Sequence, residues 1–276
     1  MKKSLIVANW KMNLNTHEAS LLVKRFDDNI EMHRDVEVVI APSFLTLQPI
    51  SVQIDRRKFK LASQDGYLVD QGAYTGEVSF TMLRDLVHYS IIGHSERRIY
   101  FNETLEVVRD KVQAAIRNEI NPILCVGETK HERSAGETKR VIHDQITTAL
   151  SNLTPEEVEN ISIAYEPVWA ISTFGGELAK PDEIEKVVKM IRSLISEISG
   201  DKIARDMRIL YGGSVDDQTA TGYLAIDGVD GLLVGSASLN YHKFSKIVAS
   251  AYRAHAKPDK KSWVKKIRAK SPSRRL

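Results

Sequence analysis

The segment ISIAYEPVWA, residues 161–170, contains the transition that decides how this chain folds. Residues 161–164 form an apolar run with the length of a short buried strand. Glu166 follows where this strand meets a loop, Pro167 stiffens the exit, and Trp169 gives the loop an aromatic group that can pack. The segment therefore predicts a strand that carries a carboxylate at its C-terminal end.

Two further segments show the same arrangement. The apolar run at residues 5–8 leads into Asn9-Trp10-Lys11, and the run at residues 90–92 leads into GHSERR, residues 93–98. A carboxylate, an imidazole and an ammonium group thus each follow a predicted strand. In a barrel of parallel strands these ends converge on one face, where the active sites of that fold lie.

The whole chain alternates short apolar runs with longer amphipathic segments. Near-continuous apolarity, as in VEVVIA at residues 36–41, is typical of a strand that is covered on both faces. Alternation of this kind predicts a parallel sheet closed into a barrel, although periodicity alone leaves an open doubly wound sheet as the alternative. The predicted strands lie near 4–9, 36–41, 59–63, 89–93, 121–126, 161–165, 207–211 and 230–234, and the clearest helices at 105–117, 138–150 and 182–198.

Composition limits the class of protein. A hydrophobic content of 42% and a charged content of 27% are typical of a globular protein, and 276 residues suffice for one barrel or two ordinary domains. The single cysteine, Cys125, excludes an internal disulfide framework and favours a reducing compartment. We expect no signal peptide, because its removal would remove Lys11, and no apolar stretch approaches the roughly 20 residues of a membrane span. A cytoplasmic location is expected.

Charge is distributed unevenly along the chain. Residues 251–276 carry ten Lys or Arg and one Asp, whereas residues 1–250 carry a net charge of −6. The overall charge of +3 therefore describes a mildly acidic body with a basic tail.

Further motifs make the chain resemble the triosephosphate isomerase family, in order from Ile6 to Ile247. They are GAYTGE at residues 72–77, CVGE at 125–128, YGGSV at 211–215 and DGLLVGSA at 230–237. The resemblance implies a single (β/α)8 TIM barrel over residues 1–252 and a flexible basic tail over 253–276. It also implies interconversion of dihydroxyacetone phosphate and D-glyceraldehyde 3-phosphate in glycolysis and gluconeogenesis, without a cofactor or a metal.

The resemblance assigns catalytic roles to three residues. Glu166 is the expected base, since a carboxylate shielded from water can remove a proton next to a carbonyl. His94 is the expected electrophile, and the N–H groups of the helix that starts after it favour neutral imidazole. Lys11 supplies positive charge to the substrate and to the developing oxyanion. Without the motifs, each could equally be a surface ion pair, a satisfied histidine or a solvated lysine.

Substrate-binding residues are expected around these three. Asn9 lies on the same side of its strand as Lys11, and Glu96 is a supporting residue or the partner of an ordinary ion pair. The glycine-rich turns that contain Ser214, Gly235 and Ser236 can present backbone N–H groups to a phosphate. By resemblance, Ser172 in the loop after the sixth strand adds a further N–H group.

Two departures from the family pattern concern these loops. The usual GTGK tip is replaced by STFG at residues 172–175, followed by a longer connection to Pro181, which puts the closing rate of the loop in question. Ser236 stands where the family usually has a second glycine, so phosphate binding there requires a backbone conformation that tolerates a side chain.

Residues 65–79 form a long polar, glycine-rich connection, which is unusual unless it is functional. The resemblance implies a homodimer in which Thr75 reaches toward the partner's active site. The alternative is a free surface loop.

Two other functions stay open. A different phosphate-binding barrel enzyme would share the fold, which does not by itself require Glu166, His94 and Lys11 together. Alternatively, a binding protein could use the basic tail on nucleic acid or an anionic membrane surface, with Trp263, Val264 and Ile267 on one helical face. A solvated tail is the simpler interpretation. The cysteine and histidine spacing predicts no zinc site, and no dinucleotide motif follows the first strand.

Overall fold

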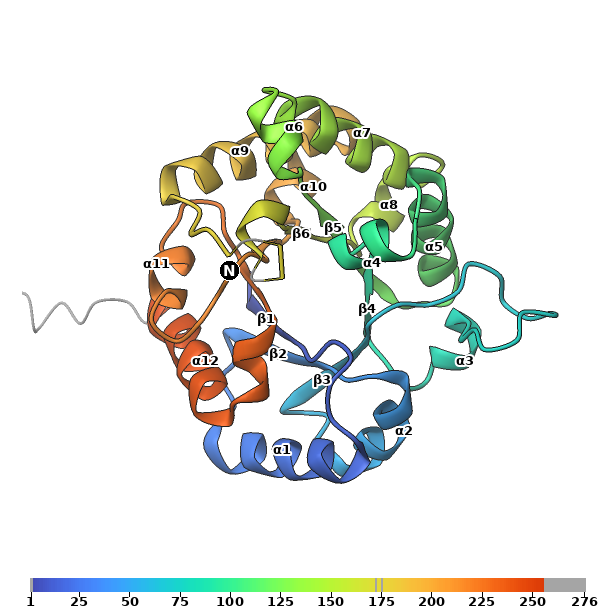
Figure 1. The fold of residues 1–276 in the computed structure, drawn as a ribbon, viewed down its shortest axis with the longest axis vertical. Helices are drawn as coiled ribbons and strands as arrows, with labels where there is room; N and C mark the ends of the chain where they lie inside the picture. Colours follow the sequence, from blue (N-terminus) through green and yellow to red (C-terminus); the bar gives the residue numbers. More distant parts are fainter. Residues whose placement is uncertain (1, 172, 175, 256–276) are drawn as a thin grey trace, which may run out of the picture.

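The computed structural model describes residues 2–171, 173–174 and 176–255. Eight parallel strands form a closed barrel in chain order, and helices surround it (Figure 1). The first strand pairs with the last as well as with the second, from Leu5↔Gly231 to Ala8↔Val234. This pairing confirms the barrel and excludes the open sheet.

All eight strands lie where the sequence predicts them, within about two residues at each end, the usual scatter of such boundaries. They are β1 (Ser4–Asn9), β2 (Val36–Ala41), β3 (Phe59–Ser63), β4 (Tyr89–Ile92), β5 (Asn121–Val126), β6 (Ser162–Tyr165), β7 (Ile209–Tyr211) and β8 (Gly231–Val234). The largest difference is in β7, which was expected from residue 207. Helix α10 (Asp201–Asp206) ends there instead, and the N–H of Met207 bonds back to the carbonyl of Ile203. The backbone of Met207 therefore closes the helix.

The three predicted helices are present as α5 (Leu105–Arg117), α7 (Thr138–Leu150) and α9 (Pro181–Ser199). The last of the described helices, α12, extends to His255. The remaining ones are α1 (Thr16–Asn29), α2 (Phe44–Gln53), α3 (Phe80–Leu83), α4 (Ser95–Tyr100), α6 (Lys130–Ser134), α8 (Pro155–Val158), α11 (Ala220–Leu224) and the 3-10 helices η1 (Val168–Ala170) and η2 (Ser236–Leu239). No helix within the described ranges is long and apolar enough to cross a membrane.

Alternation along the strands divides the buried side chains into two clusters, because successive residues point to opposite faces. One cluster fills the barrel and includes Leu5, Val7 and Cys125. The other packs the strands against the helices and includes Ile6, Ala8 and Phe26. Burial, and then the nearby Glu166 carboxylate, raise the pKa of the Cys125 thiol well above its ordinary value. Cys125 is thus a protonated packing residue.

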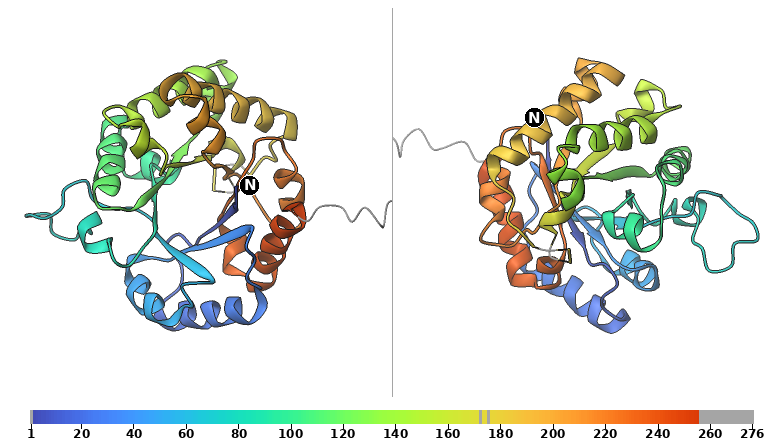
Figure 2. Two further views of the ribbon diagram at one scale, coloured as in Figure 1. Left: turned by 180° about the vertical axis from the view of Figure 1, so that it is seen from behind. Right: turned by 45° about the horizontal axis from the view of Figure 1, so that its top comes forward.

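The connection between β3 and α3, residues 64–79, projects from the barrel in both views of Figure 2, and we call it the excursion. It is held in shape by its own contacts: the rings of Tyr67 and Tyr74 lie 4.7 Å apart, and Tyr67 bridges to Ser79. Thr75 is exposed in this excursion.

Candidate active site

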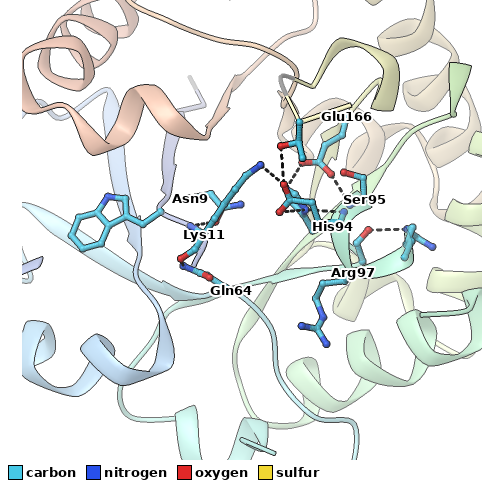
Figure 3. Close-up of polar contacts among 12 residues, drawn as sticks. Asn9, Lys11, Gln64, His94, Ser95, Arg97 and Glu166 are labelled. Atoms are coloured by element: carbon cyan, nitrogen blue, oxygen red, sulfur yellow. Dashed lines mark hydrogen bonds and ion pairs between the residues drawn. The ribbon is translucent and has the colours of Figure 1, made fainter. Parts of the chain in front are cut away.

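A cavity of about 420 Å³ opens at the C-terminal ends of the strands. It is lined by residues from both ends of the chain, which only barrel closure brings together. Seven of the predicted site residues line it: Asn9, Lys11, His94, Glu166, Ser214, Gly235 and Ser236. Figure 3 shows Lys11, His94 and Glu166 converging from three strand ends.

Glu166 is held in a buried position directly after β6. Its backbone N–H donates to the carbonyl of Val126 at 2.7 Å. The carboxylate is 2% exposed, with Oε1 3.1 Å from Nε2 of His94, and Oε2 accepts from the N–H of Ser95 at 3.2 Å. Burial by itself raises the pKa of the Glu166 carboxyl, but His94, Ser95 and the charge of Lys11 outweigh it and hold the pKa below its ordinary value. An ionised carboxylate is therefore favoured.

His94 is the N-cap residue of α4. Its Nδ1 accepts a hydrogen bond from the N–H of Glu96 at 3.2 Å. Because a backbone amide can only donate, Nδ1 carries no proton, and the ring is neutral with its proton on Nε2. That proton points toward Oε1 of Glu166, 3.1 Å away. His94 thus presents a neutral N–H donor to the cavity.

Lys11 adopts a left-handed backbone conformation with φ of 53°, which is uncommon for a residue with a side chain. Its N–H donates to Oδ1 of Asn9 at 3.1 Å, and its carbonyl accepts from Nε2 of Gln64 at 2.9 Å. Nζ lies 2.5 Å from Oε1 of Glu96. The structure thus places Glu96 against Lys11, and Asn9 and Gln64 fix the backbone that aims the ammonium group into the cavity.

Gln64 was missed in the sequence analysis. It also donates to the carbonyl of Ala41 at 2.9 Å, so it links the ends of β1 and β2. The available signal is its position, since Gln64 is a polar residue directly after β3, as Trp10 and Lys11 directly follow β1.

Two glycines make room for Glu166. A Cβ on Gly127 would lie 1.8 Å from the carbonyl oxygen of Glu166, and one on Gly212 would lie 2.9 Å from its Cγ. Distances this short require Glu166 or its strand to shift. Gly212, expected in a phosphate turn, therefore also provides space for the side chain of Glu166.

The turns expected to bind phosphate, which contain Ser214, Gly235 and Ser236, line the same cavity and form its phosphate end. Ser236 begins η2 without a positive φ, so serine fits where the family usually has glycine. The N–H of Ser214 donates to the carbonyl of Ala170 at 3.0 Å in this structure. It must exchange that partner before it can bind a phosphate. Ser172 lies outside the described residues.

The loop after η1 is anchored at its start. Nε1 of Trp169 donates to Glu128 at 2.9 Å, and the guanidinium of Arg133 lies 3.7 Å from the centre of the indole ring. Trp169 thus packs as expected, whereas Glu128 was noted only as part of a motif. Farther along, Thr173 donates to Glu96 at 3.2 Å, and the ring of Phe174 lies 5.7 Å from that of Tyr100. The altered loop tip is therefore in contact with α4.

Thr75 does not line this cavity. Within the ranges that the structure describes, no group of three or more His, Cys, Asp or Glu residues is arranged to hold a metal ion.

Comparison with known proteins is consistent with this geometry. The family model for triosephosphate isomerase matches residues 4–251. A triosephosphate isomerase of Chloroherpeton thalassium is 43% identical over 256 residues, covering 91% of this chain and 100% of the relative. One of Dictyoglomus turgidum is 43% identical over 251 residues, with 91% and 100% covered, and one of Alkaliphilus metalliredigens is 44% identical over 249 residues, with 90% and 99% covered. With the barrel and the three strand-end residues, these matches show that the chain belongs to the triosephosphate isomerase family.

Proposed function

We propose that this protein interconverts dihydroxyacetone phosphate and D-glyceraldehyde 3-phosphate, a step of glycolysis and gluconeogenesis. The observation that carries the proposal is the pairing of a buried carboxylate with a neutral imidazole N–H. Glu166 Oε1 and His94 Nε2 lie 3.1 Å apart in a cavity that Lys11 also lines. The Glu166 carboxylate can accept a proton from a carbon next to a carbonyl group, while the N–H of His94 and the ammonium of Lys11 can stabilise the carbonyl oxygen.

In the proposed reaction, Glu166 removes a proton from the carbon next to the carbonyl. The C–H electron pair forms the C=C bond of an enediolate, while the carbonyl oxygen takes the negative charge. The N–H of His94 and the ammonium of Lys11 stabilise that oxygen. A proton then moves from the hydroxyl group of the deprotonated carbon to the enediolate oxygen. Return of the abstracted proton to the former carbonyl carbon leaves the other oxygen as the new carbonyl and completes the isomerisation. No cofactor is needed, because no electrons leave the substrate.

Phosphate binding is assigned to backbone N–H groups of Gly235, Ser236, Ser214 and Ser172. The position of Gly235 and Ser236 on the cavity wall supports this assignment. The contact between Ser214 and Ala170 would be exchanged for the phosphate when the loop closes.

The alternative of another phosphate-binding barrel enzyme is less well supported. Such an enzyme needs the phosphate end of the cavity but has no requirement for Glu166, His94 and Lys11 within one cavity. The family membership also favours the isomerase.

A coupled assay on the purified protein tests the proposal with each triose phosphate as substrate. We expect rapid interconversion in both directions, and its loss in Glu166→Gln, which is nearly isosteric but cannot act as a base. An inactive wild-type protein that is folded by circular dichroism would refute the function. Equal activity in Glu166→Gln would refute the assigned base.

We also propose a cytoplasmic homodimer. Exposed apolar side chains support the association: Leu45 and Met82 belong to α2 and α3, which lie on the side from which the excursion with Thr75 projects (Figure 1), and Met12 and Phe101 are exposed as well. Contiguous exposed apolar groups are typical of subunit interfaces. Contact of the basic tail with nucleic acid or an anionic surface is the weaker proposal, and residues 256–276 lie outside the described ranges.

A further inference from the structure

The charged side chains at the cavity considered so far do not favour an anionic substrate, because carboxylates offset the positive charge. Glu166 and Asp216 both line the cavity with carboxylates, while the Lys11 ammonium lies 2.5 Å from Glu96. A triose phosphate brings a further charge of about −1.5 to −2 into this space. A second cation at the phosphate end would offset the repulsion.

Lys243 is in a position to supply that charge. It is the third residue of α12 (Tyr241–His255) and lines the cavity together with Ser236 and Asn240. Its backbone N–H donates to Oδ1 of Asn240 at 3.1 Å, which fixes the first turn of the helix against the phosphate end. The side chain itself is exposed and can reach a ligand.

The ammonium group of Lys243 is not committed to a carboxylate. Among the described residues, no Asp or Glu oxygen lies within ion-pair distance of it, whereas Lys246 on the same helix lies 3.2 Å from Asp217. Its charge does act on its surroundings. Burial raises the pKa of the Asp216 carboxyl, but hydrogen bonds from Thr219 and Gln218 and the charge of Lys243 hold the pKa below its ordinary value.

We infer that Lys243 is an additional phosphate-binding residue, which contributes to affinity for the phosphorylated substrate beside the backbone N–H groups of Gly235 and Ser236. This inference rests on the isomerase function proposed above and adds a residue to it. The phosphate keeps its charge throughout the reaction, so Lys243 stabilises the ground state and the transition state alike. Its contribution belongs in KM and in the rate of encounter, not in kcat.

Lys243→Met tests the inference. We expect KM for both triose phosphates to rise about two- to fivefold, as for loss of one solvent-screened ion pair. In contrast, kcat should stay within about twofold, as for loss of uniform binding. Lys243→Arg should restore KM. Lys246→Met is the matched control: it removes the same charge from the same helix at a position that does not line the cavity, and should leave KM unchanged.

Ionic strength and a non-reacting ligand supply independent readouts. The wild-type kcat/KM should fall more steeply with added salt than that of Lys243→Met, because salt screens an exposed charge. Binding of inorganic phosphate, measured by calorimetry, should weaken in Lys243→Met only. This measurement requires no turnover, so it decides the role of Lys243 even if the isomerase assay fails.

An unchanged KM and phosphate affinity in Lys243→Met would overturn the inference. So would an equal loss in Lys246→Met, which would trace the effect to net charge and not to position. A fall in kcat at constant KM would also overturn it.

Discussion

As the proposed base, Glu166 has to be confined yet able to reach a substrate carbon. In the structure, the carboxylate faces Nε2 of His94 and accepts from the N–H of Ser95, and a substrate would replace or share these contacts. The two glycines beside it, Gly127 and Gly212, leave the space that such a movement requires.

Glu166→Asp should retain the fold and lower kcat by about 10²-fold, because one methylene fewer withdraws the carboxylate by about 1 Å from the reacting carbon. Steady-state kinetics measures the loss, and circular dichroism checks the fold. Turnover close to that of the wild type would contradict the role of Glu166 as base.

Lys11 and His94 should respond differently to substitution. Lys11→Met should weaken binding of a phosphorylated enediolate analogue as well as slow the reaction, since the ammonium faces both ground state and transition state. His94→Gln should slow the reaction with a smaller effect on analogue binding, because it removes a donor needed mainly by the developing oxyanion. Calorimetric titration of both variants makes the comparison. Unchanged affinity of Lys11→Met for the analogue would place the lysine outside the site.

At the scale of elements, a buried group of charges joins the base of the excursion to α4 and α5. Lys111 is 4% exposed and lies 2.7 Å from Asp65, and it also contacts Glu103. Nε of Arg97 lies 3.0 Å from Oδ2 of Asp65 and also contacts the carboxylate of Glu103. Arg97 belongs to the helix that His94 caps, so this group fixes the helix that orients the imidazole.

Lys111→Met should lower the free energy of unfolding by about 3–5 kcal/mol, because two buried carboxylates lose the more deeply buried of their two shared partners and retain only Arg97. Urea denaturation at a fixed protein concentration measures the change. Lys202→Met is the matched control, since its pair with Glu159 is exposed and should contribute less than about 1 kcal/mol. An equal change in both variants would show that burial does not determine the contribution of Lys111.

At the scale of the whole molecule, the excursion with Thr75 extends away from the cavity of its own barrel (Figure 2). Light scattering on an active preparation should therefore report about twice the monomer mass of 31.1 kDa. Thr75→Arg should weaken the association, while Glu197→Arg, an exposed position on α9 away from the excursion, should not. An active monomer of the wild-type protein would refute the dimer.

The activity and the thermal stability of the barrel should not depend on the basic tail. Tyr252 stacks on His33 with ring centres 3.6 Å apart, so α12 is already anchored before residue 256. Removal of residues 256–276 should leave activity and Tm nearly unchanged. Retention on heparin and on RNA across a salt gradient tests whether the tail binds polyanions. Equal retention of the full-length and the truncated protein would refute this role. Loss of activity on truncation would show that the tail packs on the barrel.

Local sequence determined much of this protein. Runs such as VEVVIA at residues 36–41 specify buried strands because nearly every residue is apolar, and residues 138–150 specify a helix by their period. Glu166, His94 and Lys11 were identified because short motifs surround them and because strand ends in a barrel share one face. The motifs also indicated the family before any contact between these residues was known.

Only the tertiary structure decided how those parts fit together. Gln64 beside Lys11 and Gly212 against Glu166 join residues that lie 53 and 46 positions apart. Lys243 shares the cavity wall with Lys11 only because β8 closes onto β1. The tautomer of His94 likewise follows from the direction of one backbone N–H. Sequence patterns report the environment that each residue needs, whereas distances between side chains from different strands are set by the closure and register of the barrel.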